Sequence, residues 1–80
     1  MIPLYGFLEG DTIGLLILAD ENDTGAVLIQ KLQASARVRV KPRARVKLLH
    51  NGQTIDPQTT VTQARMAALD RIDVVGVLSR

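Results

Sequence analysis

The chain has 80 residues, a net charge of +2, one histidine and no cysteine. This length favours one domain, covering residues 1–80, with a modest hydrophobic core. The absence of cysteine excludes disulfides, zinc–thiolate sites and cysteine nucleophiles, and the lone His50 cannot build a metal cluster, so no cofactor is expected.

The first two predicted elements form a β-hairpin. Residues 2–8 are apolar and strand-like, Glu9-Gly10-Asp11 reads as a tight turn, and residues 12–19 (TIGLLILA) give a second strand. The apolar run of residues 13–19 is too short to span a bilayer, and the N-terminus has no charged region typical of a signal peptide. We therefore expect a soluble, cytoplasmic protein.

A helix of about three turns is predicted next. Residues 20–24 form a polar loop in which Asp23 or Thr24 can cap a helix. Apolar or small residues then recur at helical spacing. They are Gly25, Leu28, Ile29, Leu32 and Ala36.

The second half of the chain reads mainly as strands and turns. Pro42 interrupts the basic stretch, so residues 37–41 are expected to be extended and residues 45–50 to form a third strand. Asn51-Gly52 is a strong turn signal. The remaining predicted pieces are a short strand at 53–55, one helical turn within 59–66, and a last strand at 71–77. The order β-β-α-β-β, short helix, β predicts an α+β fold, a mixed sheet with the helix across one face.

Positive charge is concentrated in one stretch. Six of the ten lysines and arginines alternate with apolar residues between Arg37 and Lys47. Such a strip is commonly a solvated sheet face, but it also suits an acidic protein partner. Nucleic acid is a third interpretation, but the chain has few aromatic residues for stacking and no nucleic-acid-binding motif, and both observations argue against it. The candidate charged residues of an interface are Arg39, Arg43, Arg45 and Lys47.

Several apolar residues are predicted to face away from the core. If Ile13, Leu15 and Ile17 fill the core, alternation turns Leu16 and Leu18 outward. In the same way Leu49 and Val75 lie opposite the core residues Leu48 and Val74. Exposed apolar residues on neighbouring strands mark a protein interface more often than chance exposure. The candidate apolar anchors are therefore Leu16, Leu18, Leu49 and Val75.

No catalytic constellation is visible in the sequence. His50 has no carboxylate partner near it in the chain, so a local hydrogen-bonding role beside the turn is expected. The glycines match neither GxGxxG nor GxxxxGK[ST] and read as turns or points of close packing. We expect no enzymatic activity, no catalytic residue and no metal site.

The chain resembles the ubiquitin-like β-grasp fold over nearly its whole length. The resemblance rests chiefly on RVKLLHNGQTIDPQTTVTQARMAALDRIDVV, which starts at Arg45. In the first half of the chain it rests on the turn residues Gly10-Asp11-Thr12-Ile13 and the helix-start residues Asp23-Thr24. It implies that Leu49 and Val75 lie close together on the outer sheet face in a partner-binding patch.

A narrower resemblance is to the small subunit, called B or gamma, of toluene and related aromatic monooxygenase hydroxylases. It rests on residues in order along the chain: Ile2-Pro3, Phe7, Glu9, Asp11, Asp20, Asn22-Asp23-Thr24, Arg39-Val40-Lys41-Pro42, Arg45-Val46-Lys47, His50, Gly52, Pro57, Thr60-Val61, Ala64, Asp70 and Ile72-Asp73-Val74-Val75. The resemblance implies an accessory subunit that holds neither iron nor substrate and packs on the large diiron subunit.

The alternative hypothesis is a stand-alone ubiquitin-like adaptor in a secretion or modification-like system. The sequence ends Val77-Leu78-Ser79-Arg80, without the Gly-Gly that conjugation or sulfur transfer requires. Such an adaptor would therefore bind its partners non-covalently.

Overall fold

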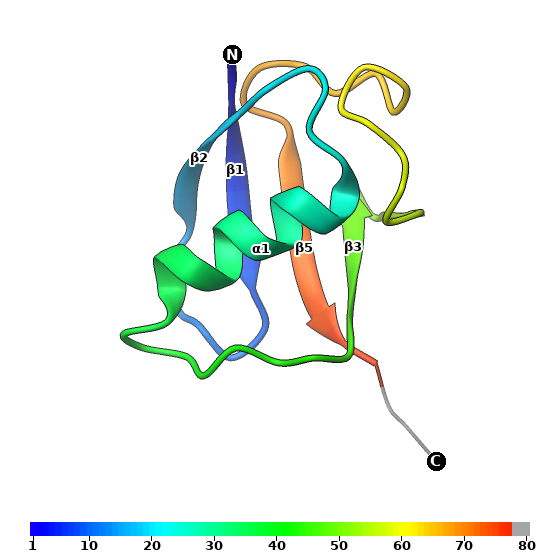
Figure 1. The fold of residues 1–80 in the computed structure, drawn as a ribbon. Helices are drawn as coiled ribbons and strands as arrows, with labels where there is room; N and C mark the ends of the chain where they lie inside the picture. Colours follow the sequence, from blue (N-terminus) through cyan, green and yellow to red (C-terminus); the bar gives the residue numbers. More distant parts are fainter. Residues whose placement is uncertain (78–80) are drawn as a thin grey trace.

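The computed structural model describes residues 1–77, which form a five-stranded sheet with one helix lying across one face (Figure 1). In chain order the elements are β1 (Ile2–Leu8), β2 (Leu15–Ala19), α1 (Gly25–Ala36), β3 (Val46–His50), β4 (Gln53–Ile55) and β5 (Arg71–Gly76). The strand order across the sheet is β2-β1-β5-β3-β4. β1 runs parallel to β5 and every other pair is antiparallel, so the expected α+β fold with a mixed sheet is confirmed.

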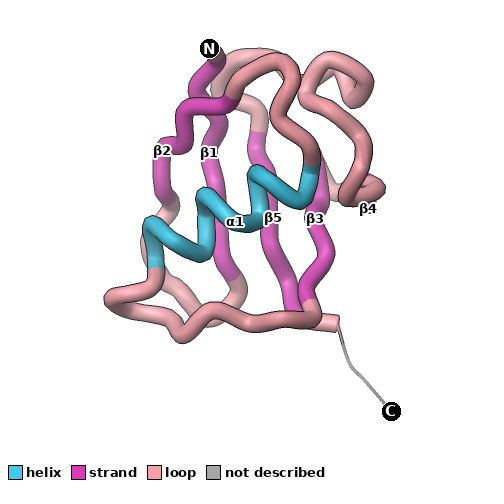
Figure 2. Tube along the Cα trace, viewed as in Figure 1, coloured by secondary structure: helices cyan, strands magenta, loops and turns pink. Residues whose placement is uncertain are grey.

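Figure 2 shows α1 lying across one face of the sheet, and the core side chains lie between the two. Leu28 and Leu32 of the helix meet Leu4, Leu48 and other side chains that alternate along the strands. Leu48 and Val74 are buried, as predicted. The opposite face of the sheet, called the outer face below, has no helix or strand packed over it among residues 1–77, because α1 is the one helix and all five strands belong to the sheet.

The helix begins where the sequence predicts. Thr24 adopts an extended backbone, and its Oγ1 accepts a 3.3 Å hydrogen bond from the Val27 N–H. This bond satisfies one of the free N–H groups of the first turn. Gly25, Leu28, Leu32 and Ala36 are buried, and Ile29 packs against the same core.

Two segments in the first half of the chain differ from prediction. The second strand starts at Leu15, three residues late, and Ile13 is 48% exposed rather than part of the core. Its N–H donates to Asp11 Oδ1, which holds residues 11–13 in a loop. Residues 37–41 are not extended: the N–H groups of Arg39 and Val40 both donate to the Ala36 carbonyl, so a turn follows the helix.

The predicted helical turn within residues 59–66 is present only as hydrogen-bonded turns at residues 61–65. The Ala64 N–H donates to the Thr60 carbonyl, four residues back, but the pattern stops there. Arg65 has a positive φ of 56°, which ends any helical continuation.

Candidate protein interface on the outer sheet face

The edge strand β2 and its neighbour β1 carry the most exposed apolar side chains of the sheet. Leu16 is 60% exposed, Leu18 is 55% exposed and Tyr5 is 46% exposed. Tyr5 pairs with Leu16, and Pro3 pairs with Leu18. All four project from the outer face, because their neighbours Leu4, Gly6, Ile17 and Ala19 face the core. We call Pro3, Tyr5, Leu16 and Leu18 the β2 patch.

Leu49 and Val75 lie on the outer face of β3 and β5. Val75 is opposite Lys47, and Leu49 is opposite Asp73, two residues along the same strand. Leu49 and Val75 are therefore diagonal neighbours, close enough for their side chains to touch. Both are half-buried rather than fully exposed.

The four predicted anchors do not form one cluster. β1 and β5 separate β2 from β3, and a polar pair occupies the outer face of β5. Arg71 makes a two-pronged ion pair with Asp73, with nitrogen–oxygen distances of 3.0 Å, and its guanidinium lies 4.1 Å from the centre of the Phe7 ring. Arg71 and Asp73 thus divide the outer face into the β2 patch and the Leu49–Val75 pair.

The predicted basic residues also lie in two separate places, one on the outer face and the others at one end of the sheet. Lys47 is exposed on the outer face beside Val75. Arg39, Arg43 and Arg45 instead belong to the connection from α1 to β3, which runs past the β1–β2 turn at one end of the sheet (Figure 1). Arg45 is exposed, and its carbonyl accepts from the Val77 N–H. The basic stretch from Arg37 to Lys47 is therefore not one continuous strand. Pro42 predicted this interruption, and residues 37–40 form a turn.

Arg39 is engaged with Asp11 of the β1–β2 turn. Its Nε lies 3.1 Å from Asp11 Oδ1 and its Nη2 lies 2.9 Å from Oδ2. The Asp11 side chain is only 2% exposed. Hydrogen bonding from Arg39 lowers the pKa of Asp11, and the same contact raises the pKa of Arg39.

Arg43 makes a second link between the same two loops. Its Nη1 donates to Glu9 Oε1 at 2.9 Å, and the Gly76 N–H donates to the same oxygen at 2.9 Å. The hydrogen bond from Gly76, followed by the one from Arg43, lowers the pKa of Glu9. Gln33 of α1 exchanges two side-chain hydrogen bonds with the Arg43 backbone. Arg39 and Arg43 therefore form ion pairs within the chain, which argues against a nucleic-acid-binding surface here.

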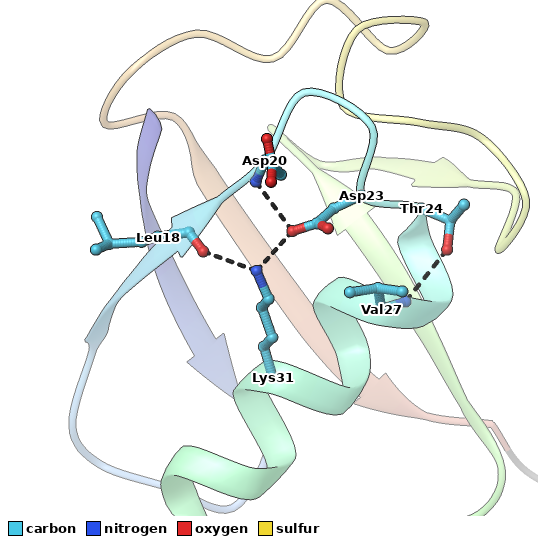
Figure 3. Close-up of polar contacts among 6 residues, drawn as sticks. All are labelled: Leu18, Asp20, Asp23, Thr24, Val27 and Lys31. Atoms are coloured by element: carbon cyan, nitrogen blue, oxygen red, sulfur yellow. Dashed lines mark hydrogen bonds and ion pairs between the residues drawn. The ribbon is translucent and has the colours of Figure 1, made fainter. Parts of the chain in front are cut away.

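Lys31, which sequence reasoning did not single out, lies at the free edge of β2 (Figure 3). Its Nζ donates to the Leu18 carbonyl at 3.0 Å and to Asp23 Oδ2 at 2.6 Å. The same Asp23 oxygen accepts from the Asp20 N–H. Burial opposes ionisation of Asp23, but the hydrogen bonds from Lys31 and Asp20 outweigh it, so the pKa of Asp23 is lowered.

His50 has a long-range carboxylate partner that the sequence did not reveal. Its Nε2 lies 2.9 Å from Asp70 Oδ2, and that oxygen also accepts from the Ala67 N–H. Hydrogen bonds from Ala67 and then from His50 lower the pKa of Asp70. The pair fixes the loop before β5, in which Leu69 is 56% exposed with a φ of 67°. The Leu69 N–H donates to the Pro3 carbonyl, so Leu69 borders the β2 patch.

Residues 1–77 contain no group of three or more histidine or acidic side chains arranged to hold a metal ion. Within the same residues, no helix has the length and apolar character needed to cross a membrane.

Comparison with known proteins gives one family and a set of similar folds. The family described as toluene-4-monooxygenase system protein B matches residues 1–75. A chain of the solved structure "Toluene 4 monooxygenase HD Complex with Inhibitor 4-Bromobenzoate" superposes with a TM-score of 0.86 at 21% identity, covering 95% of this chain and 98% of that chain. No curated protein matches.

Two further solved structures identify the fold as ubiquitin-like. "Caldiarchaeum Subterraneum Ubiquitin" has a TM-score of 0.78 at 15% identity, covering 98% of this chain and 95% of that chain. "Molecular Mimicry of SUMO promotes DNA repair" has a TM-score of 0.74 at 22% identity, with coverage of 96% and 90%. The expected β-grasp fold is confirmed.

Proposed function

Because the chain belongs to the toluene-4-monooxygenase system protein B family, we propose that it is a non-catalytic accessory subunit of a diiron aromatic monooxygenase hydroxylase. It docks on the large subunit and stabilises it, and it acts in the cytoplasm. The observation that carries the proposal is the family match over residues 1–75. In this proposal the chain itself catalyses no reaction. Its single histidine, His50, holds the loop before β5 through its contact with Asp70.

The outer face supports a docking role. One side of the sheet is sealed by α1, whereas the other presents the β2 patch and the Leu49–Val75 pair. Apolar side chains exposed on one face of a small domain are typical of a protein interface. Leu16, Leu18, Leu49 and Val75 are the proposed apolar contacts, with Lys47 and Arg45 as the charged rim. Of the other two predicted rim residues, Arg39 pairs with Asp11 and Arg43 with Glu9, so they add little to the contact.

Co-purification of the tagged chain with the hydroxylase large subunit tests the proposal. We expect a stoichiometric complex that Leu18→Asp and Leu49→Asp each weaken at least about tenfold, since a charge buried at an interface costs more than 1.4 kcal/mol. Gln30→Asp, on the exposed side of α1, is the matched control and should bind as the unaltered chain does. Capture of a secretion or activating-enzyme component without any oxygenase subunit would overturn the proposal in favour of a ubiquitin-like adaptor.

A further inference from the structure

The outward edge of β2 offers backbone hydrogen-bonding groups. β2 ends the sheet, and only β1 pairs with it among residues 1–77. In an antiparallel pair, alternate residues direct their N–H and C=O away from the neighbouring strand. Leu18 is such a residue, because its partner Pro3 has no N–H to exchange. Leu16 lies two residues away on the same strand, so its N–H and C=O also point away from β1.

Three hydrogen bonds support this orientation of the backbone groups. The Leu18 carbonyl accepts a hydrogen bond from Lys31 of α1, and not from the neighbouring strand β1 (Figure 3). On β1, the Pro3 carbonyl accepts from Leu69 and the Tyr5 N–H donates to Asp70, so both backbones turn toward β5 rather than toward β2.

The two residues with outward backbone groups are also the two most exposed leucines of the sheet, Leu16 and Leu18. An edge that combines outward-directed backbone groups with apolar side chains is a template for another strand. Apolar side chains on an added strand would pack beside these leucines on the outer face.

Lys31 donates to the Leu18 carbonyl, the acceptor that an N–H of an added strand would use. A lysine at a sheet edge opposes unwanted strand pairing. Its ammonium has three donors, of which the Leu18 carbonyl and Asp23 receive two. Lys31 can therefore release Leu18, keep Asp23, and donate to an acidic group on an incoming segment.

We propose that an extended segment of the hydroxylase large subunit adds to the edge of β2 as a sixth strand. This proposal rests on the proposed function and goes further by naming the binding mode. The segment carries apolar side chains that pack on Leu16 and Leu18, and an acidic side chain that pairs with Lys31. A second copy of this chain is a poorer occupant, because antiparallel pairing of two β2 edges would bring a lysine from each copy to the same short junction.

Hydrogen exchange of the chain, alone and in complex with the large subunit, tests the proposal. The Leu16 and Leu18 amides should slow at least about tenfold on complex formation, the scale of one net hydrogen bond. The Ile17 amide faces β1 and is the internal control, protected in both states. A complex in which Leu16 and Leu18 exchange at the free rate would overturn strand addition while leaving the accessory-subunit role intact. Failure to form any complex would instead remove the proposed function itself.

A pair of variants separates backbone pairing from side-chain contact. Leu16→Ala removes apolar surface and keeps the N–H, whereas Leu16→Pro also removes the outward donor without touching a bond to β1. We expect the proline variant to bind the large subunit at least about tenfold more weakly than the alanine variant. Equal affinities, with both variants folded by circular dichroism, would contradict strand addition. Sedimentation of the free chain as a dimer with protected Leu16 and Leu18 would also contradict it.

Discussion

At the scale of single residues, Gly6 shows how tightly the helix sits on the sheet. A Cβ at this position would lie 2.8 Å from both Ile17 Cδ1 and Leu32 Cδ1. We predict that Gly6→Ala lowers the free energy of unfolding by about 1–3 kcal/mol through overpacking. Urea denaturation measures the change. Adding Leu32→Val should restore part of the loss, because it trims one of the two clashing side chains; no recovery in the double variant would mean that the clash is not the cause.

Asp70 makes a residue-scale prediction about pH. Its pKa is lowered in the folded state by the Ala67 N–H and then by His50. A lowered folded pKa adds stability at pH values above the unfolded pKa of about 3.9, and that stability is lost as the pH falls through the folded value. Asp70→Asn should therefore be less stable at neutral pH and converge with the unaltered chain in acid. A stability difference that persists unchanged below the folded pKa would contradict the assignment.

At the scale of elements, two ion pairs fasten the α1–β3 connection to the β1–β2 turn. Arg39 holds Asp11 and Arg43 holds Glu9. We predict that Arg39→Gln speeds amide exchange at Arg39 and Val40, because the turn after α1 loses its anchor. Asp11→Asn should have the same effect, and the double variant should add little beyond either single one. Fully additive effects would show that the two residues act separately.

The order of elements was predictable because it depends on local patterns. The helical spacing from Gly25 to Ala36, the Thr24 cap and the Asn51-Gly52 turn each determine structure within a few residues. The error at Ile13 depends on a longer-range contact, because Asp11, which accepts from the Ile13 N–H, is itself held by Arg39, 28 positions away. Ile13 looks like a core residue by alternation, but Asp11 and the loop it organises remove residues 12–14 from the strand.

The candidate site was predictable only in part for the same reason. Alternation correctly turned Leu16 and Leu18 outward, and would also have found Tyr5. It could not show that Arg71 and Asp73 divide the outer face, because that depends on strand order. The pairs His50–Asp70 and Lys31–Leu18 join residues that are 20 and 13 positions apart, and no local motif signals either one.

At the scale of the whole molecule, the two faces of the sheet have different roles. The inner face and α1 account for the buried core, so stability depends mainly on that side. The outer face is ordered by the Arg71–Asp73 ion pair and by the Arg71–Phe7 contact, and it keeps Tyr5, Leu16 and Leu18 accessible. A variant on the outer face can therefore change binding with little effect on folding, which is the separation that the docking experiments require.

The distribution of charge leads to a prediction about salt. Arg39 and Arg43 are already paired within the chain, so a partner gains little from them. We predict that affinity for the large subunit changes by less than about threefold between about 0.05 M and about 0.5 M salt, a range over which surface attractions are strongly screened. Leu18→Asp should abolish most of the binding at either salt concentration. If the basic stretch were instead a nucleic-acid surface, binding to duplex DNA would fall by orders of magnitude over this range and would ignore Leu18→Asp. Titrations with both ligands at the two salt concentrations therefore distinguish an apolar docking face from a basic one.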